Sequence, residues 1–492
     1  MTDPEVVAAF LSDAAHVPGG HAAGVAFPQN ESDAAALVGS AERVLPVGAQ
    51  SSLTGGATPR GEIVLSTRAM TAIRVSASSV RVGAGVALAS LQQELTRHRL
   101  YYPPVPTFDG AFCGGTIATN AAGAATFKYG STRDWVAEVT VLLANGEVLE
   151  LERGETVAND DHAFEIETSG GDVIRVPLPG YHMPHVAKLS AGYFARRGMD
   201  LVDLFVGSEG TLGIVTAATL KVLPMPRRSV VVIRCSDEAQ ALAVSGVLRR
   251  EAHLAWQHRG PLDVAAIEYI DARSLRLLST DVFARAAVGR PADEEVVLLV
   301  QIETPTDDSA AIRRLEEVLA SGGVTEEVTI ALPDDPRGAQ RLFELRESVP
   351  ATVNALIGAR KARQPGLHKT AGDMIVPFDR VADSLSLYRR AFYSRGLEHA
   401  IWGHVSDGNL HPNVLPQSLD DVRNGESAIL EIARGVIAMG GAPLAEHGVG
   451  RSPLKQRLLR EMYGDQGIDE MRAVKRALDP AWKLAPGVLF PP

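Results

Sequence analysis

The pattern of apolar residues changes once along this chain, at the proline-bearing segment KVLPMPRRS (221–229). Before it, short apolar strands alternate with glycine-containing turns, as in VLPVGA, EIVLST and SVRVGAGV. After it, strand-like and helix-like runs alternate, beginning with SVVVIRC and EAQALAVSGVLRREAHLA, and such alternation builds a sheet covered by helices. A chain of 492 residues is also long for a single core. The sequence therefore predicts an α+β protein with at least two domains.

Local signals predict individual elements. The ANGE turn (144–147) lies between two alternating apolar runs, which is typical of a β-hairpin. Apolar residues recur with helical spacing from Leu88 to His98. Asp3 and Pro4 suit the cap and the first position of an N-terminal helix, and the last helix should stop near Asp479, before a proline.

Composition and charge exclude several classes of function. The formal net charge of −11 argues against a general affinity for nucleic acid, which needs a basic surface to displace counterions from phosphates. Two cysteines are too few for a disulfide framework and fit a reducing compartment. The N-terminus does not resemble a signal peptide, and the apolar runs are strand-length. We expect a cytoplasmic globular enzyme whose membrane association, if any, is peripheral at the inner face.

The segment IWGHVSDGNLHPNV (401–414) places two imidazoles, His404 and His411, around a glycine-bearing turn expected to be a loop. The segment AEHGVG (445–450) adds Glu446 and His447. Two imidazoles and one carboxylate are a common ligand set for catalytic zinc or a similar divalent cation, and Glu446 would complete it, leaving His447 free. The spacing is not that of a standard zinc motif, so a hydrogen-bonded structural role for either histidine stays open.

Three glycine-rich segments predict a phosphate-bearing cofactor: PVGAQSSLTGGATP (46–59), FCGGTIATNAAGAATFKYGSTRDW (112–135) and LFVGSEGTLGIV (204–215). Glycine removes the Cβ that would block close approach, and successive backbone N–H groups form a concavity for pyrophosphate oxygens. Other phosphate motifs fit poorly, because GAGVAL (83–88) lacks the last glycine of GxGxxG and no GxxxxGK[ST] occurs. A tight turn is the alternative for any one of these loops taken alone.

In order along the chain, PVGAQSSLTGG, CGGTIATNAAGAATFKYGSTRDW, DLFVGSEGTLGIVTAATLKVLP, GHVSDGNLHPNV and EHGVG resemble the FAD-binding oxidoreductases of the vanillyl-alcohol-oxidase superfamily. Within it they are similar to the D-lactate dehydrogenase, glycolate oxidase large-subunit and D-2-hydroxyglutarate dehydrogenase group. The resemblance implies a two-part FAD-binding domain, residues 1–226 with a returning segment 441–492, and a ferredoxin-like α+β cap at 227–440.

The resemblance also implies which residues contact the flavin. Attachment is expected to be noncovalent, because the first glycine-rich loop lacks the His, Cys or Tyr of covalent relatives. Asn409 is expected to bond the flavin or to orient an imidazole. The remaining flavin-binding positions are Val47, Gly48, Ala49, Gln50, Ser51, Ser52, Pro106, Thr107, Gly114, Gly115, Thr119, Ala122, Gly123, Ser131, Glu209, Gly213 and Ile214.

The implied reaction is oxidation of a D-2-hydroxy acid, D-lactate favoured, to the 2-oxo acid by hydride transfer to flavin N5. His447 matches the general base, Arg346 in FELRES matches the carboxylate clamp, and Lys369 is a weaker match that needs an alignment gap. Zinc is the expected metal, with manganese or iron as alternatives. An extended loop from Asp160 to Lys188 departs from the family pattern, and its three histidines are expected on the surface.

Two other functions stay open from the sequence. One is a redox-neutral transferase similar to alkyl-dihydroxyacetonephosphate synthase, and the other is a flavin-binding partner subunit of a glycolate oxidase complex. Retention of His404, His411, Glu446 and His447 argues against the partner subunit. The electron acceptor is expected to be a quinone, a cytochrome, an electron-transfer flavoprotein or an iron–sulfur subunit, and a homodimer stays open as the assembly.

Overall fold

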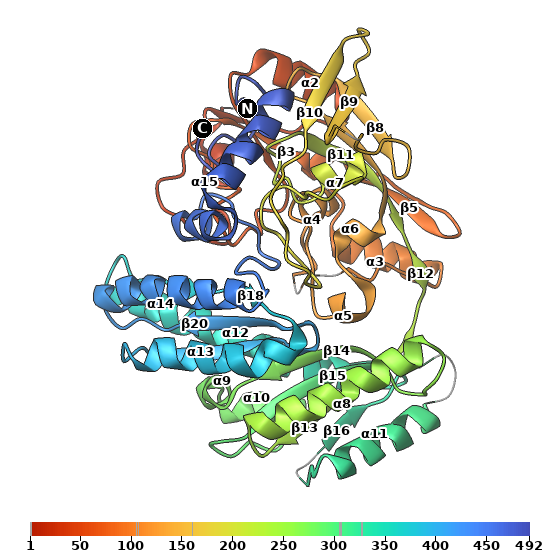
Figure 1. Cartoon of the computed structure of the whole chain (residues 1–492), viewed down its shortest axis with the longest axis vertical. Coiled ribbons are helices and arrows are strands. Elements are labelled where there is room, and N and C mark those ends of the chain that lie inside the picture. Colours follow the sequence, from red (N-terminus) through yellow and green to blue (C-terminus); the bar gives the residue numbers. More distant parts are fainter. Residues whose placement is uncertain (1, 105, 107, 160, 305–307, 326–327) are drawn as a thin grey trace.

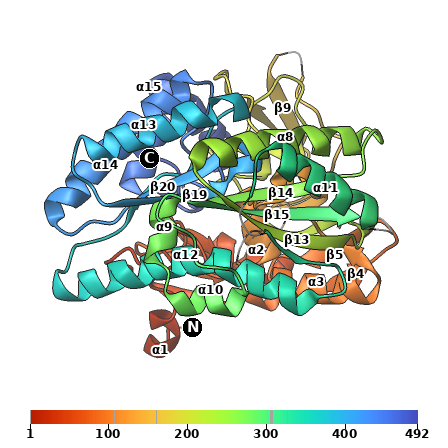
Figure 2. The same cartoon turned by 90° about the horizontal axis from the view of Figure 1, so that it is seen from below.

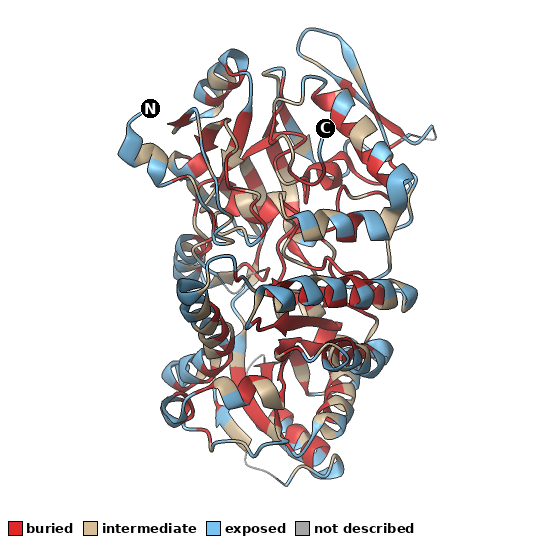
Figure 3. Cartoon of the chain, turned by 90° about the vertical axis from the view of Figure 1, so that its left-hand side faces the viewer, coloured by how far each residue is buried: buried red, intermediate tan, exposed pale blue. Residues whose placement is uncertain are grey.

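The chain folds into two lobes, shown one above the other in Figure 1. This computed structural model describes residues 2–104, 106, 108–159, 161–304, 308–325 and 328–492, so the predicted flavin residue Thr107 lies outside the described residues. The central lobe runs from β13 (Arg227–Cys235) to α14 (Leu419–Ala438), and the terminal lobe contains the segments before and after it. In both lobes the strands are mostly buried, and the helices that surround them expose their outer faces to solvent (Figure 3).

Two sheets organise the terminal lobe. A parallel sheet has the order β1–β3–β2, and an antiparallel sheet has the order β4–β5–β11–β7–β8. A short pair joins β6 (Leu100–Tyr101) to β12 (Leu223–Pro224). The sheet strands are β1 (Gly24–Ala26), β2 (Val44–Val47), β3 (Ile63–Ser66), β4 (Ile73–Val75), β5 (Ser79–Gly83), β7 (Val136–Leu142), β8 (Val148–Glu152) and β11 (Ile214–Lys221).

The helices of the terminal lobe include the two that local signals predict. The helix α3 (Leu88–Arg97) buries Leu88, Leu91 and Leu95, and the N-terminal helix α1 (Pro4–Ala8) is capped by Asp3. The predicted hairpin is also present, because β7 pairs with β8 with Leu142 opposite Val148. The other helices before the central lobe are α2 (Glu31–Ser40), η1 (Thr67–Ala69), α4 (Cys113–Ala118), α5 (Thr126–Tyr129), α6 (Thr132–Trp135) and α7 (Leu201–Phe205).

The region expected as an extended loop before Lys188 contains regular structure instead. Strand β9 (Ala163–Glu167) pairs with β10 (Val173–Pro177) as a hairpin, with Ile174 opposite Ile166. After it, residues 178–199 run without helix or strand to α7, and we call this segment the strap. The expectation of a loop was wrong for the hairpin, whose short alternating strands were not recognised. The three histidines of the region, His162, His182 and His185, are exposed as expected.

One antiparallel sheet of eight strands forms the centre of the central lobe. Its order is β16–β13–β15–β14–β19–β20–β17, and β18 also pairs with β20. Strands β18 and β20 lie at the boundary between the lobes (Figure 1). The strands after β13 are β14 (Asp263–Ile270), β15 (Val296–Thr304), β16 (Val328–Ala331), β17 (Thr370–Ala371), β18 (Met374–Ile375), β19 (His399–His404) and β20 (Asn409–Val414).

Helices cover both faces of this sheet (Figure 2). Successive side chains of a strand point to opposite faces, so Val230 and Val232 pack in one core while Val231 and Ile233 pack in another. The first core includes α9 (Ala272–Leu277), α10 (Thr280–Ala286) and α12 (Pro336–Arg363). The second includes α8 (Glu238–Trp256), α11 (Ser309–Ser321), α13 (Val381–Tyr393) and α14, and the 3-10 turn η2 (Phe378–Arg380) leads into α13.

The C-terminal segment packs back onto the terminal lobe. Helix α15 (Pro453–Leu478) ends next to its C-cap Asp479, near the predicted position, and the tail then forms a parallel bridge between Leu484 and Val44 of β2. The buried Lys475 donates to the carbonyl oxygen of Thr211 at 2.5 Å and to that of Leu484 at 2.9 Å. The last residues of the chain are thereby held beside the third glycine-rich loop.

Candidate active site

A β-hairpin brings the two motif histidines together. His404 ends β19 and His411 lies in β20, with the 3-10 turn η3 (Val405–Asp407) between the strands, so the expectation that both lie in a loop was wrong. In the register of the hairpin Trp402 is opposite His411 and His404 is opposite Asn409. Because side chains alternate along a strand, His404, Asn409 and His411 share one face. Both imidazoles are buried.

Glu446 sits at the centre of three imidazoles. Its Oε1 lies 3.4 Å from Nε2 of His404, 3.3 Å from Nε2 of His411 and 3.5 Å from Nε2 of His447. The backbone N–H groups of Glu446 and His447 both donate to Oδ2 of Asp373, at 2.8 and 2.9 Å. All four predicted residues of this group, three histidines and one carboxylate, are therefore adjacent although they come from two segments of the chain.

Asp373 is a buried carboxylate that the sequence reasoning missed. Besides the two N–H groups, it accepts from Nδ2 of Asn409 at 3.1 Å. Its oxygens also lie 3.6 Å from Nδ1 of His411 and 3.3 Å from Nδ1 of His447. Burial opposes ionisation of Asp373, but His447, Lys455 and His411 hold its pKa below the usual value. Its place, just before β18 in AGDMIVP, gave no motif by which to find it.

Glu268 of β14 is a second carboxylate that no motif predicted. Its Oε1 contacts Nδ1 of His404, and its Oε2 accepts from Nε of Arg346 in α12 at 2.5 Å. Burial would raise the pKa of Glu268, but His404 and Arg346 lower it to about 2, so the carboxylate is ionised. The side chain of Glu268 therefore connects Arg346, the predicted carboxylate clamp, to His404, a predicted metal ligand.

A lysine of the strap also reaches this group. The side chain of Lys188 is fully buried, and its Nζ lies 2.9 Å from Oε2 of Glu446 and 3.2 Å from Oδ2 of Asp407. Nearby, Ser190 donates from its N to the carbonyl oxygen of Leu444 and from its Oγ to that of Thr119. The strap therefore links the segment of Glu446 to the second glycine-rich loop.

The donor atoms fit a divalent cation. The ligand atoms of His404, His411 and Glu446 all lie within 4.8 Å of one another, as do those of a second set, Asp373, His411 and His447. The oxygens of Asp373 already accept three hydrogen bonds, whereas Oε1 of Glu446 and the imidazole Nε2 atoms point toward one another. Neutral imidazole nitrogen and carboxylate oxygen suit zinc, manganese or iron. The first set is therefore the better candidate.

His447 differs from the predicted metal ligands Glu446 and His404 in its pKa and its exposure. Desolvation lowers the pKa of His447 to about 4, although Asp373 and Glu446 favour its protonated form. Burial would raise the pKa of Glu446, but Lys188 and His404 hold it well below the ordinary value. The side chain of His447 is 30% exposed, against 4% for His404. His447 is thus a neutral imidazole at the open side of the group.

The three glycine-rich loops converge beside this group. Gly48 of the first loop lies beside Gly115 of the second, since a Cβ on Gly48 would be in ordinary van der Waals contact with the Gly115 Cα, at 3.8 Å. Glu209 of the third loop accepts from the N–H groups of Val449 and Gly450, at 2.7 and 2.8 Å. A Cβ on Gly115, in contrast, would meet nothing within 4 Å. The open space beside Gly115 fits a cradle for a phosphate-bearing cofactor.

Apart from Pro106, the described flavin positions of the terminal lobe lie on these loops, and Asn409 lies across in the central lobe. Several polar side chains already have local partners: Gln50 donates to the carbonyl oxygens of Ala9 and Ser12, and Thr119 to that of Gly115. By element, Val47 ends β2, Gly48 to Ser52 follow it, Pro106 precedes α4, Gly114 and Gly115 lie in α4, Thr119 and Ser131 cap α4 and α6, Ala122 and Gly123 lie between α4 and α5, Glu209 and Gly213 precede β11, and Ile214 begins it.

Two further predicted residues, Asn409 and Lys369, differ in whether they contact the group around Glu446. Nδ2 of Asn409 bonds Asp373 and the carbonyl oxygen of Met374, while its Oδ1 is buried without a partner among the described residues. Lys369 is half-buried just before β17 and donates to Oδ1 of Asn354 at 3.1 Å. Desolvation lowers the pKa of Lys369 to about 8. The structure brings Asn409, but not Lys369, into contact with the group around Glu446.

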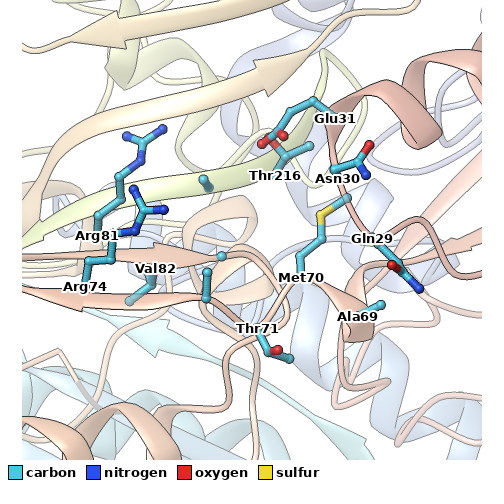
Figure 4. Close-up of a pocket in the computed structure, with 13 residues that line it drawn as sticks. Gln29, Asn30, Glu31, Ala69, Met70, Thr71, Arg74, Arg81, Val82 and Thr216 are labelled. Atoms are coloured by element: carbon cyan, nitrogen blue, oxygen red, sulfur yellow. The ribbon is translucent and has the colours of Figure 1, made fainter.

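A separate cavity of about 620 Å³ opens in the terminal lobe (Figure 4). It lies between the start of α2 and strands β4 and β5, where Arg74 and Arg81 are opposite each other. Arg81 is paired with Glu138 at 3.3 Å and donates to Thr140 at 3.0 Å. None of the lining residues belongs to the glycine-rich loops or to the histidine group, so this cavity is not the candidate site.

Comparison with known proteins agrees with this arrangement. Residues 22–152 match the FAD binding domain family, and residues 248–489 match the FAD linked oxidases, C-terminal domain. The chain is 28% identical to the glycolate oxidase subunit GlcD of Bacillus subtilis, over 91% of this chain and 83% of that protein. It is equally identical to a D-lactate dehydrogenase of Anaerostipes hadrus, over 90% of this chain and 83% of that one.

A solved structure shares the fold. An alkyldihydroxyacetonephosphate synthase superposes with a TM-score of 0.61 over 94% of this chain and 75% of that chain, at 15% sequence identity. Among the described residues, no helix combines the length and the apolar character that crossing a bilayer requires.

Proposed function

Because this chain belongs to the FAD-linked oxidases, we propose that it oxidises a D-2-hydroxy acid, D-lactate favoured, to the 2-oxo acid. The observation that carries the proposal is the convergence of three imidazoles on Oε1 of Glu446, with Nε2 distances of 3.3 to 3.5 Å. Relatives named D-lactate dehydrogenase and glycolate oxidase subunit support this substrate class.

The cofactors supply the chemistry that side chains lack. The glycine-rich loops would hold FAD noncovalently, and the flavin would supply the acceptor for the hydride from the substrate Cα. His404, His411 and Glu446 would hold a divalent cation, zinc favoured, which would supply Lewis acidity for the substrate hydroxyl.

His447 accepts the hydroxyl proton. Its Nδ1 faces Oδ2 of Asp373 at 3.3 Å, which favours the tautomer with the proton on Nδ1 and leaves the lone pair on Nε2. Its low pKa keeps the ring neutral before the reaction, as a proton acceptor must be. Nε2 is therefore the atom that takes up the proton.

Arg346 binds the substrate carboxylate. Its guanidinium offers a planar fork that matches a carboxylate with two parallel hydrogen bonds. Nε is already bonded to Glu268, so the two Nη atoms remain for the substrate. Lys369 is assigned a secondary role at most, because its partner is Asn354.

The test is anaerobic stopped-flow absorbance with purified, metal-replete protein. D-lactate, L-lactate, glycolate and D-2-hydroxyglutarate are mixed in turn, and bleaching of the oxidised flavin band is followed. We expect one D-acid to bleach the flavin, and His447→Gln to slow that step by about 10² to 10⁴-fold, the usual contribution of a positioned base. His182→Gln, on an exposed histidine of the strap, is the matched control and should leave the rate unchanged.

A failure of all four acids to reduce the flavin would contradict the proposed reaction. Flavin that is bound but bleached by none of the acids would exclude the dehydrogenase and favour the redox-neutral transferase or the partner subunit. We further propose that reoxidation uses a quinone, a cytochrome, an electron-transfer flavoprotein or an iron–sulfur subunit, in the cytoplasm or at the inner face of its membrane. Turnover assays with each acceptor class test this directly.

A further inference from the structure

We propose that Glu268 is a positioning residue that couples the metal ligand His404 to the substrate clamp Arg346. This inference rests on the proposed function and adds a residue to it. Glu268 lies in the mostly apolar strand β14, whose residues Ile267 and Tyr269 pack in one core and Ile270 in the other. A carboxylate buried in such a strand needs compensation, because burying a charge without partners is costly.

Each oxygen of Glu268 has a different partner. Oε1 contacts Nδ1 of His404 and Oε2 accepts from Nε of Arg346. The side chains are 4% exposed for Glu268, 4% for His404 and 9% for Arg346. The three groups are therefore largely shielded from solvent, and each oxygen of the carboxylate has a protein partner. The orientation of one carboxylate therefore determines the orientation of both partners.

The contact between Glu268 and His404 leaves Nε2 of the imidazole free to bind a metal ion. A carboxylate at Nδ1 holds the ring proton there and leaves Nε2 as the lone-pair donor, which is the common second contact of metal-binding imidazoles. Nε2 of His404 is the atom that lies 3.4 Å from Oε1 of Glu446. Glu268 thus selects both the tautomer and the direction of this ring.

The contact between Glu268 and Arg346 orients the guanidinium group for the substrate carboxylate. Bonding through Nε fixes the plane of the guanidinium, and within the described part of the chain both Nη atoms are left without a hydrogen-bond acceptor. Arg346 comes from α12, which packs on one face of the sheet, and His404 comes from β19, the strand that pairs with β14. One side chain therefore sets the position of the substrate carboxylate relative to the cation.

The experiment measures cation affinity as well as turnover. Zinc affinity of the FAD-loaded protein is determined by competition with a chromophoric chelator, for the parent and for Glu268→Gln. We expect Glu268→Gln to weaken zinc binding by roughly 10 to 100-fold, the usual effect of removing such a partner, and to raise KM for the acid without changing FAD content. Glu268→Asp keeps the charge but is one methylene shorter, and should show the same changes to a smaller degree.

Glu303 provides a matched control in the neighbouring strand β15. Its side chain is 5% exposed and is paired with Arg228 at 2.6 Å and Lys128 at 2.8 Å, so Glu303→Gln also breaks buried ion pairs. We expect Glu303→Gln to lose stability while keeping zinc affinity. Equal weakening in Glu303→Gln and Glu268→Gln would show a merely structural role and overturn the inference.

The outcomes separate this inference from the proposed function. If the parent binds zinc and is reduced by a D-acid while Glu268→Gln binds zinc equally well, the inference is wrong and the function stands. If the parent binds no cation, the proposed metal site fails and this inference fails with it. Where Glu268→Gln does not fold, Glu268→Asp provides the same comparison.

Discussion

Nζ of Lys188 lies 2.9 Å from Oε2 of Glu446, so the two oxygens of that carboxylate have different surroundings. Oε2 is held by the lysine, and Oε1 faces the three imidazoles. Glu446 is therefore arranged to offer a cation one oxygen rather than two. Because Lys188 belongs to the strap, the terminal lobe takes part in shaping a centre whose histidine ligands come from the central lobe.

Removing Lys188 should strongly destabilise the protein. Lys188→Met removes the ammonium group that pairs with the buried carboxylates of Glu446 and Asp407. Breaking a buried ion pair in this way lowers the free energy of unfolding by about 3 to 5 kcal/mol. Thermal unfolding of the chelator-treated protein should show a clearly lower midpoint. Lys361→Met, on an exposed lysine, is the control and should unfold like the parent. A parent-like midpoint for Lys188→Met would contradict the buried pairing.

Filling the open space beside Gly115 should abolish flavin binding. The residue lies in α4, where a side chain would project into space that meets no protein atom within 4 Å, so Gly115→Leu should fold and bind little FAD. The measurement is flavin absorbance per mole of purified protein. Gly39→Leu, at a helical glycine with equally open surroundings in α2, should retain full flavin. Full flavin in Gly115→Leu would place the cofactor elsewhere.

Metal removal should separate flavin binding from flavin reduction. After dialysis against a chelator we expect FAD to remain, because the glycine-rich loops do not include the cation ligands His404, His411 and Glu446. Reduction by the substrate should slow by about 10²-fold or more, since Lewis-acid assistance is worth several kcal/mol, and zinc or manganese should restore it. Reduction by dithionite is the control. An unchanged substrate rate in protein shown by elemental analysis to lack metal would exclude the cation from the reaction.

His399 should make the fold sensitive to mild acid. The ring is 2% exposed, its Nε2 has no partner among the described residues, and it packs 4.9 Å from the ring of Phe392. Burial lowers the pKa of His399 to about 4, and Arg273 and Arg389 oppose protonation more than Glu398 favours it. Between about pH 6.5 and 4 the unfolded chain then binds a proton that the folded chain does not.

Stability should therefore fall as the pH drops through this window, by up to roughly 3 kcal/mol, and level off below it. His399→Asn, whose amide can still reach the Leu397 carbonyl oxygen bonded by Nδ1, should flatten this part of the profile. Denaturant unfolding at pH 7, 5.5 and 4.5 measures the effect. His182→Asn, at an exposed position, should keep the slope of the parent. An unchanged slope in His399→Asn would assign the acid sensitivity to other groups.

Local sequence signals were sufficient for elements that depend on neighbouring residues. Helix α3 and the β7–β8 hairpin follow from the spacing of apolar residues and from the ANGE turn, because periodicity and turn chemistry are properties of short segments. The hairpin β9–β10 was missed although AFEIE alternates apolar and charged residues just as VLELE of β8 does, and its register pairs Ile166 with Ile174.

The residue types of the candidate site were also visible in the sequence, but not their partners. His404, His411, Glu446 and His447 could be named from two motifs, and their roles stay predictions. Glu268 contacts His404 from 136 positions away, and Lys188 contacts Glu446 across 258 positions. Whether a charged residue is solvated or buried against a ligand depends on which strands pair and which segments cross. Sequence alone determined the chemistry available to this chain, and only the packing of distant segments, within each lobe and between the lobes, decided which groups orient it, because burial and charge pairing arise between such segments.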